Sequence, residues 1–434
     1  MEQLLHYCWK HRLFPLHPLE TTNGQKIEVL DVGLYNTNAG SDFLNAKIKL
    51  DDTVWVGNVE IHTKSSDWYV HQHQKDANYN NVILHVTGCA DTEVCTESGR
   101  KLPQLVLEVP ENVQQHYTQL LVADKHQPCY EVIAKLPQLT LHSWMSALQI
   151  ERLEQKTNEI TQRLNLCKGD WEQTLFITLA RNYGFGINGE VFEQWAMNIP
   201  LHSVDHHRDD LFQIEAFFMG QAGLLEDGFV PQKYLSAMSK EGYFEQLRTE
   251  YLYLKHKFGL QPIDGHLWKF LRLRPQNFPY IRIAQLAKLY HLRTFGIRNL
   301  LNSESIKALK ETMKTAVSAY WQTHYVFGSM SKRSEKHLSD ASLNVLLINT
   351  AIPMLFAYGR LHGEENLCEK AFDYLEELKP ESNHIIKRWQ LCGIKIENAG
   401  DTQALIQLQK KYCDTKDCLR CRIGYEYLKA IHNS

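Results

Sequence analysis

The sequence has no strong charge of either sign, no long apolar run and no low-complexity linker. Lys and Arg total 47 against 50 Asp and Glu, which gives a net charge of −3 at pH 7. This balance disfavours a protein that binds nucleic acid through bulk positive charge, although it leaves room for a local basic groove. Because no stretch approaches about 20 uninterrupted apolar residues, we expect no membrane span.

The first 14 residues, MEQLLHYCWKHRLF, lack an apolar core of signal-peptide length and include Glu2, Lys10 and Arg12. We therefore expect no secretion signal. The ten cysteines are scattered along the chain without ligand-like spacing over most of its length. This usage predicts a reducing, cytoplasmic environment in which the thiols are free or bound to metal rather than paired.

The length of 434 residues, with 44% hydrophobic and 22% charged residues, predicts a globular protein with two or three cores. Residues 1–135 hold short β-branched runs bounded by Gly, Asn, Asp or Pro, which are typical of strands. These runs are KIEVLDVGLY, NAKIKL, TVWVGNVEIH, NNVILHVT and PQLVLEVP. Residues 136–434 carry apolar residues every three or four positions, which is typical of amphipathic helices. We predict an N-terminal α/β domain with a mixed sheet, residues 1–135, and an all-helical domain, residues 136–434.

Residues 40–64, GSDFLNAKIKLDDTVWVGNVEIHTK, form a predicted hairpin that turns at Asp51-Asp52. A three-residue loop would place Lys49 opposite Thr53 and keep the even-numbered apolar residues, Val54 and Val56 included, on one buried face. The same alignment sets Ala46 opposite Val56 and Asp42 opposite Glu60. His62 and Lys64 follow on the same face because side chains alternate along a strand.

Two carboxylates, an imidazole and an ammonium group would thus meet at one end of an apolar face. Like charges so close raise a pKa or recruit a cation, and Asp and Glu oxygens suit Mg²⁺ or Mn²⁺. A nearby His62 or Lys64 could orient or deprotonate an attacking water. The alternative is a half-buried sheet end whose acids are solvated.

This arrangement resembles the PD-(D/E)XK nuclease core, in which an Asp begins one strand and an (Asp/Glu)-x-Lys motif lies on the next. The resemblance implies Asp42 as the first acid, Glu60 as the second and His62 in the place of the usual Lys, with Lys64 as a substitute. Ser41 stands where the motif has Pro. The segment SSDWYVHQHQKDANYN would be the short helical crossover, and NVILHVT the next strand.

A group of histidines and aspartates follows the hairpin, and it offers a second kind of metal site. Its members are Asp67, His71, His73, Asp76 and His85. Neutral His is a common transition-metal ligand, so a Zn²⁺ site of a metallohydrolase is one interpretation. Another is that some of these residues line the pocket of Glu60 and bind phosphate. The plainer alternative leaves His71 and His73 on the surface and His85 hydrogen-bonded within its strand.

Four cysteines near the C-terminus form a third candidate site. Cys413, Cys418 and Cys421 read C-x4-C-x2-C, and Cys392 precedes them by 21 residues. Four thiolates can hold Zn²⁺ or an iron–sulfur cluster. The alternative is a set of buried thiols in a helical core, where free Cys packs as a small apolar residue.

In the helical part, WKFLRLRPQNFPYIRIAQLAKLYHLR carries Arg272, Arg274 and Arg282 next to a loop with Phe278. Such a group can hold phosphates and stack bases, although arginines on helices more often pair with acids. GFGING, residues 184–189, lacks the Lys-Ser/Thr of a phosphate-binding loop and is interpreted as a helix end.

The whole chain also resembles an uncharacterised bacterial family, a domain of unknown function. The phrases that carry this resemblance are GNVEIHTKSSDWYVHQHQKDANYNNVILHV, GFGINGEVFEQWA, FFMGQAGLLE and LRLRPQNFPYIRIAQLA. Together with the nuclease resemblance, the residues predict a divalent-metal-dependent hydrolase of DNA or RNA. The alternative is a catalytically silent interaction protein that keeps the nuclease-like core as a scaffold.

Overall fold

The computed structural model describes residues 1–15, 17–36, 40–122 and 129–432. By its internal contacts the chain divides into two units. Unit 1 comprises residues 1–141, 392–394 and 408–434, and unit 2 comprises residues 142–391 and 395–407. The contact boundary thus falls six residues beyond the predicted domain boundary at 135, and the C-terminal segment belongs to the unit that contains the N-terminus.

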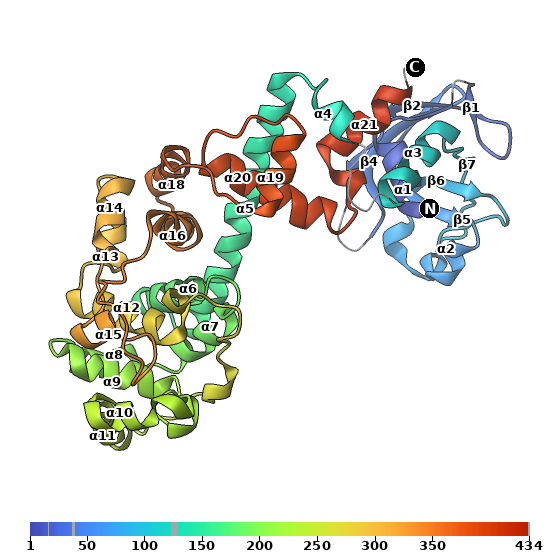
Figure 1. Ribbon diagram of the computed structural model, residues 1–434. Coiled ribbons are helices and arrows are strands. Elements are labelled where there is room, and N and C mark those ends of the chain that lie inside the picture. The colour runs from blue at the N-terminus through green and yellow to red at the C-terminus, as the bar shows by residue number, and fades with distance from the viewer. Residues whose placement is uncertain (16, 37–39, 123–128, 433–434) are drawn as a thin grey trace. The chain divides into compact units, whose positions relative to one another are not determined.

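Unit 1 is built on one mixed sheet, as the sequence predicts (Figure 1). Its described strands are β1 (Leu19–Glu20), β2 (Lys26–Asp31), β3 (Leu34–Tyr35), β4 (Phe43–Leu50), β5 (Thr53–Lys64), β6 (Val82–Cys89) and β7 (Gln104–Val106). They run in the order β1-β2-β4-β5-β6-β7, with β3 paired to β4. Strands β2, β4 and β5 are antiparallel neighbours, whereas β5, β6 and β7 are parallel.

Parallel neighbours need a crossover, and the chain supplies it between β5 and β6. The crossover contains α2 (Asp67–Val70) and two 3-10 turns, η1 (His73–Lys75) and η2 (Ala77–Tyr79). This confirms the predicted short helical connection. Trp68 and Tyr79 from the crossover pack with Val82, Val94 and Leu102 in a small apolar cluster of their own.

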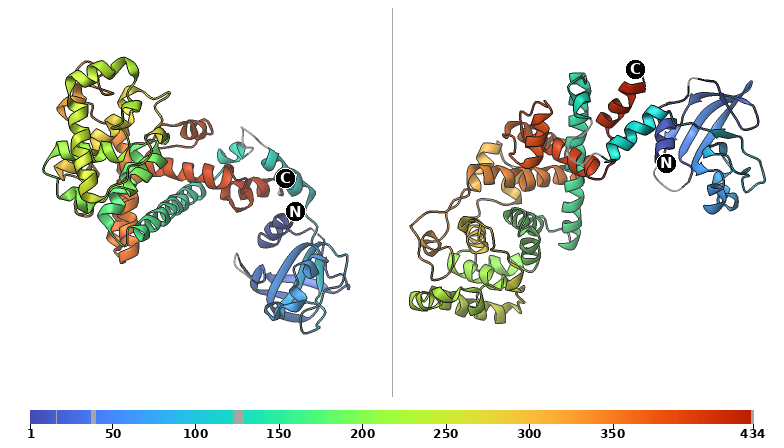
Figure 2. Two further views of the ribbon diagram at one scale, coloured as in Figure 1. Left: turned by 90° about the horizontal axis from the view of Figure 1, so that it is seen from below. Right: turned by 45° about the vertical axis from the view of Figure 1, so that its right-hand side comes forward.

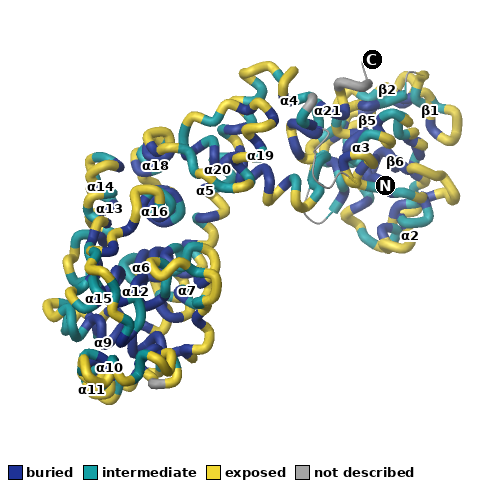
Figure 3. The backbone as a smooth tube through the Cα atoms, in the orientation of Figure 1, coloured by how far each residue is buried: buried dark blue, intermediate teal, exposed yellow. Residues whose placement is uncertain are grey.

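Helices cover the opposite face of the sheet. They are α1 (Glu2–Lys10), α3 (Glu111–Val122) and α21 (Arg422–His432), with α4 (Tyr130–Ile133) nearby in the same unit. Leu5, Val113 and Leu428 from these helices join Ile61 and Val86 of the sheet in one buried core. The right-hand view of Figure 2 shows α1 alongside the sheet, and Figure 3 shows that the interior of this unit is buried.

Unit 2 is helical, as predicted. Its longer described helices are α5 (Gln138–Leu166), α6 (Trp171–Tyr183), α7 (Gly189–Met197), α9 (Leu211–Gln221), α11 (Tyr243–Phe258), α12 (Pro279–Leu292), α17 (Ile352–His362), α18 (Glu365–Glu377), α19 (His384–Leu391) and α20 (Ala399–Gln407). Shorter helices are α8 (Leu201–Asp205), α10 (Leu235–Glu241), α13 (Ile297–Leu301), α14 (Ile306–Thr312), α15 (Ala319–Thr323) and α16 (Asp340–Leu346). Asp170 accepts hydrogen bonds from the backbone of Glu172 and Gln173, so it caps α6 as a helix-starting Asp should.

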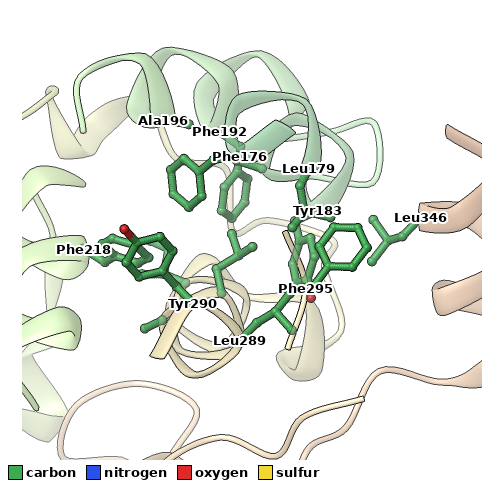
Figure 4. Packing of buried hydrophobic residues seen from close by; sticks show 14 of the residues in the cluster. Phe176, Leu179, Tyr183, Phe192, Ala196, Phe218, Leu289, Tyr290, Phe295 and Leu346 are labelled. Carbon is green, nitrogen blue, oxygen red and sulfur yellow. The ribbon is translucent and has the colours of Figure 1, made fainter. Parts of the chain in front are cut away.

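Aromatic side chains fill the core of unit 2 (Figure 4). The ring centroids of Phe176 and Phe218 lie 5.6 Å apart, and those of Phe218 and Tyr290 lie 5.9 Å apart. Among the described residues, the stretch Asp340–His362 is the one long and apolar enough to cross a membrane, yet 67% of its most apolar window is buried inside the fold. It therefore packs as a core helix of unit 2.

Candidate metal centre

The hairpin between β4 and β5 has a different register from the predicted one. Leu50 pairs with Thr53 and Lys49 with Val54, so the loop has two residues instead of three. The predicted pairs Lys49–Thr53 and Ala46–Val56 are therefore wrong. A bulge between Phe43 and Ala46 then inserts one residue into β4, and Phe43 pairs with Val59.

The two differences cancel at the end of the hairpin. Asn45 lies in the bulge between Phe43 and Ala46. It adopts a left-handed conformation with φ of 56°, which Asn tolerates better than most residues. Beyond this bulge the alignment again brings Asp42 beside Glu60. Val54 and Val56, in contrast, lie opposite Lys49 and Lys47 and are more than half exposed, so the expectation that they continue the buried face is wrong.

Backbone N–H groups hydrogen-bond the carboxylates of Asp42 and Glu60 and so hold the two residues side by side. The backbone N–H of Asp42 donates to Oε2 of Glu60 at 3.1 Å, and the N–H of Ile61 donates to Oδ2 of Asp42 at 2.9 Å. Glu60 is buried, with 5% of its surface exposed, and Asp42 is partly buried. Glu60 contacts Asp42 through one carboxylate oxygen and His62 and His73 through the other, so the second oxygen of this buried carboxylate faces imidazoles.

Two histidines face that second oxygen, and a third histidine contacts one of them. Oε1 of Glu60 lies 3.3 Å from Nε2 of His73 and 3.8 Å from Nε2 of His62. Nε2 of His62 lies 3.1 Å from Nδ1 of His71. One ring nitrogen from each of the three histidines lies within 4.8 Å of the others. Among the described residues, this is the group whose donor atoms converge as metal ligands do.

The separations match those around a small metal ion. Zn²⁺ binds imidazole nitrogen at about 2.0–2.1 Å, so two ligands of a tetrahedral ion lie about 3.3 Å apart. His62 to His71 and His73 to Glu60 both fall within about 0.3 Å of that separation. His71 is exposed while His62 and His73 are buried, so the group opens to solvent on the side of His71.

A chain of hydrogen bonds fixes the tautomer of His62. Nε2 of Gln104 donates to the carbonyl of Thr92 at 2.9 Å, which leaves Oε1 as the acceptor beside Nδ1 of His85 at 3.3 Å. A neutral His85 must then donate from Nδ1 and accept at Nε2, where Nδ1 of His62 lies 2.9 Å away. His62 consequently presents a lone pair at Nε2, the atom that faces His71 and Glu60.

Burial keeps both inner imidazoles neutral. Burial, together with the charge of the neighbouring His85, lowers the pKa of His62 to about 2. Burial also lowers the pKa of His85 to about 4, against the opposing effect of its hydrogen bond to Gln104. Burial raises the pKa of Glu60, and the charge of Asp42 adds to this effect. A neutral imidazole is the form that binds a metal.

The other predicted residues of this region lie around the centre rather than in it. Lys64 is exposed, and its charge acts on Asp91. Asp67 accepts a hydrogen bond from the backbone N–H of Lys64 at 3.0 Å, and Asp76 accepts one from Asn78 at 2.9 Å. The two aspartates thus serve the turns of the crossover that carries His71 and His73.

Sequence reasoning missed two contributors to the site. Gln104 orients His85 from β7, and no motif announces it. His6 of α1 places Nε2 3.4 Å from Oδ2 of Asp42. Burial opposes protonation of His6, but the hydrogen bond and charge of Asp42 outweigh it and raise the pKa of His6. Nothing in the sequence distinguishes His6 from the other polar residues of α1, which are Glu2, Gln3 and Lys10.

The C-terminal cysteines have a fourth neighbour that the sequence does not indicate. Cys392, Cys418 and Cys421 lie in unit 1 together with Cys129. Burial, with smaller contributions from the charges of Cys421, Cys418 and Cys392, raises the pKa of the Cys129 thiol to about 12. Cys413, predicted as a ligand, lies in the π-helical turn η8 (Leu408–Cys413).

The arginines predicted to hold nucleic acid separate into two kinds. Arg272 and Arg274 are exposed. Arg282 is 6% exposed, donates to Gln285 and Asn277, and lies over the ring of Phe185 at 4.6 Å. Burial lowers its pKa to about 10. The contacts of Arg282 are those of a buried structural residue.

Comparison with known proteins places the chain in a family. Searches of curated proteins and of solved structures gave no match. A family model described as "Protein of unknown function (DUF2851)" matches residues 2–384. The match includes Asp42, Glu60 and the histidines of the centre and ends before Cys392. The chain therefore belongs to the DUF2851 family, as its longer sequence phrases predict.

Proposed function

We propose that unit 1 is a metal-dependent hydrolase of phosphodiester bonds in nucleic acid. The observation that carries the proposal is the convergence of one ring nitrogen each from His62, His71 and His73, with the buried Glu60 beside His62 and His73. Three imidazole donors can hold one ion and leave a further coordination position for a carboxylate or a water.

The donor set favours a transition metal over Mg²⁺. Imidazole suits Zn²⁺, Mn²⁺, Co²⁺ and Fe²⁺, whereas Mg²⁺ takes oxygen ligands and keeps several waters. The carboxylates of Asp42 and Glu60 remain a second candidate pair for Mg²⁺ or Mn²⁺. A bound ion lowers the pKa of its water and offsets charge on the phosphate.

The remaining roles follow from position. A metal ion held by these residues would lower the pKa of a water molecule. In the hydrolysis, that water would give up a proton and its oxygen would add to phosphorus, while the bond from phosphorus to the leaving sugar oxygen would break and that oxygen would take up a proton. His71 is the exposed member of the centre, and His6 with a raised pKa lies beside Asp42. Either imidazole can carry a proton on the open side, and His85 with Gln104 holds His62 in position.

The order of elements also supports a nuclease over other hydrolases. A helix, an antiparallel run of strands, a helical crossover and a parallel strand follow one another as α1, β2, β4, β5, α2 and β6. The nuclease-core resemblance implies this order, with the first acid before one strand and the second on the next. Asp42 and Glu60 occupy those positions, and His62 replaces the usual Lys.

Cleavage of labelled DNA and RNA, single- and double-stranded, tests the proposal. The wild type is assayed with Zn²⁺, Mn²⁺ and Mg²⁺ beside Asp42→Ala plus Glu60→Ala and beside His73→Ala. We expect metal-dependent cleavage by the wild type and none by either variant. The matched control is His116→Ala on α3, which removes an imidazole from unit 1 outside the centre.

Two results contradict the proposal. Cleavage that survives in both variants assigns the activity to another site or to a contaminant. No cleavage of any substrate by a wild type that binds the metal favours the rival function, a silent scaffold on the same core.

For the C-terminal cysteines, we propose a structural Zn²⁺ or iron–sulfur site that includes Cys129. The support is the mutual effect of four thiols in one unit. Metal analysis and the absorption spectrum of Cys129→Ser, compared with Cys167→Ser in unit 2, test it. Equal metal content in the two variants contradicts the inclusion of Cys129.

A further inference from the structure

A cavity of about 460 Å³ lies in unit 1 and is lined in part by His6, the residue beside Asp42. One wall is a face of α1, because Gln3, His6, Tyr7 and Lys10 follow the helical spacing of three and four residues. Tyr35 and the segment 411–420 complete the lining. The volume lies within the range of pockets that take small ligands, about 300–1,000 Å³.

The cavity is basic in a chain that is slightly acidic. Lys10, Lys411, Lys416 and Arg420 line it, against Asp417 as the one acid of the lining. Nζ of Lys10 lies 5.3 Å from the ring centre of Tyr35, and Arg420 lies 3.5 Å from Asp417. This local excess of positive charge is the basic groove that the balanced overall composition left open.

The exposed ring of Tyr35 favours a nucleic acid over anions that have no base to stack. It is 41% exposed and shares the cavity with the cations. Cations that follow a backbone, together with an aromatic ring on which a base stacks, are the elements of a single-strand binding site. His6 lines the cavity and also contacts Asp42, so the cavity borders the surroundings of one of the candidate carboxylates.

We propose that this cavity holds the phosphate backbone of a single-stranded nucleic-acid segment beside the bond to be cleaved. The inference rests on the proposed function for its substrate class. It adds Lys10, Tyr35 and Arg420 as binding residues that touch neither the metal ligands nor the carboxylates.

Fluorescence anisotropy with a labelled single-stranded DNA oligonucleotide in EDTA measures this binding without cleavage. Lys10→Gln plus Arg420→Gln is expected to weaken binding about tenfold or more and to reduce the slope of log K against log salt by about 1.4, since each phosphate contact contributes about 0.7. Tyr35→Leu removes the ring on which a base would stack and should weaken binding about fivefold or more. Excess inorganic phosphate and a mononucleotide serve as competitors.

The matched control is Lys26→Gln plus Lys49→Gln, which removes two charges near the turn of the hairpin, at the far end of β4 from Asp42. Equal binding by the two double variants overturns the inference, as does a wild type that does not bind the oligonucleotide. A mononucleotide that competes as well as the oligonucleotide overturns the assignment to a strand. If the cavity variants lose binding but the wild type cleaves no substrate, the cavity still binds a single strand and the proposed hydrolysis is wrong.

Discussion

The two faces of β5 and β6 are equally buried and chemically opposite. Toward α1 and α3 the strands present Val59, Ile61, Leu84 and Val86. Toward the crossover they present Glu60, His62, His85 and Thr87, each at most 5% exposed. Apolar side chains gain free energy on leaving water, whereas polar ones lose it unless they are paired. Burial of the apolar face stabilises the fold. Burial of the polar face costs free energy, so we attribute these polar residues to function.

The largest expected effect on stability belongs to the apolar face. Ile61→Ala should lower the free energy of unfolding by about 2–5 kcal/mol, because it removes a buried side chain and leaves a cavity. Denaturation by urea measures the change. The bound metal per folded chain should stay the same, and a loss of metal without a loss of stability would contradict the division between the two faces.

On the polar face, Gln104→Leu should act on the metal rather than on folding. It removes the acceptor that orients His85 and, through it, His62. Loss of such an outer hydrogen bond typically weakens metal binding about 10- to 100-fold. Isothermal titration with Zn²⁺ measures the affinity, with Gln115→Leu on the exposed surface of α3 as the control. An unchanged affinity for Zn²⁺ would show that the hydrogen bonds from Gln104 through His85 to His62 do not orient a metal ligand.

The acid sensitivity of the metal-free protein should come from the same residues. His85 has a folded-state pKa of about 4, below its unfolded value of 6.5, so the unfolded chain binds a proton first as pH falls. The free energy of unfolding should therefore decline between pH 6.5 and 4, by up to about 1.4 kcal/mol per pH unit for each such histidine. In chelated protein, His85→Gln should remove one histidine's share of the slope, and equal slopes would contradict it.

The smallest effect tests the register of the hairpin. Val54 lies opposite Lys49 and is 55% exposed, so Val54→Thr should change the free energy of unfolding by no more than about 0.5 kcal/mol. Ile48→Val on the buried face of β4 should cost about 0.5–1.5 kcal/mol. A larger cost at Val54 than at Ile48 would favour the three-residue loop over the observed alignment.

Patterns between residues close together in the sequence were enough to predict most of the strands and helices. Alternation and β-branched runs identified β2, β4, β5 and β6, and the three-to-four spacing identified the helices of unit 2. The hairpin alignment failed because it assumed regular strands. A left-handed residue at Asn45 and a two-residue loop are local choices that alternation does not encode, and they happened to restore Asp42 beside Glu60.

The sequence predicted the residues of the metal centre as parts of separate candidate sites, because residues close in space are far apart along the chain. Glu60 and His62 were assigned to one site and His71 and His73 to another, because the sequence shows spacing along a strand but not the path of a crossover. The turn at η1 brings His73 back over β5, where its Nε2 meets Glu60. Gln104 and Cys129 come from elements that no motif connects to the hairpin, so pattern alone could not find them.

Anomalous X-ray diffraction at the zinc edge, on crystals of the zinc-loaded and then dialysed protein, tests the central claim most directly. The account predicts an ion within about 2.3 Å of His62 Nε2, His71 Nδ1 and His73 Nε2, with Glu60 as the fourth ligand. A fully zinc-loaded sample with no peak among these four side chains would contradict it.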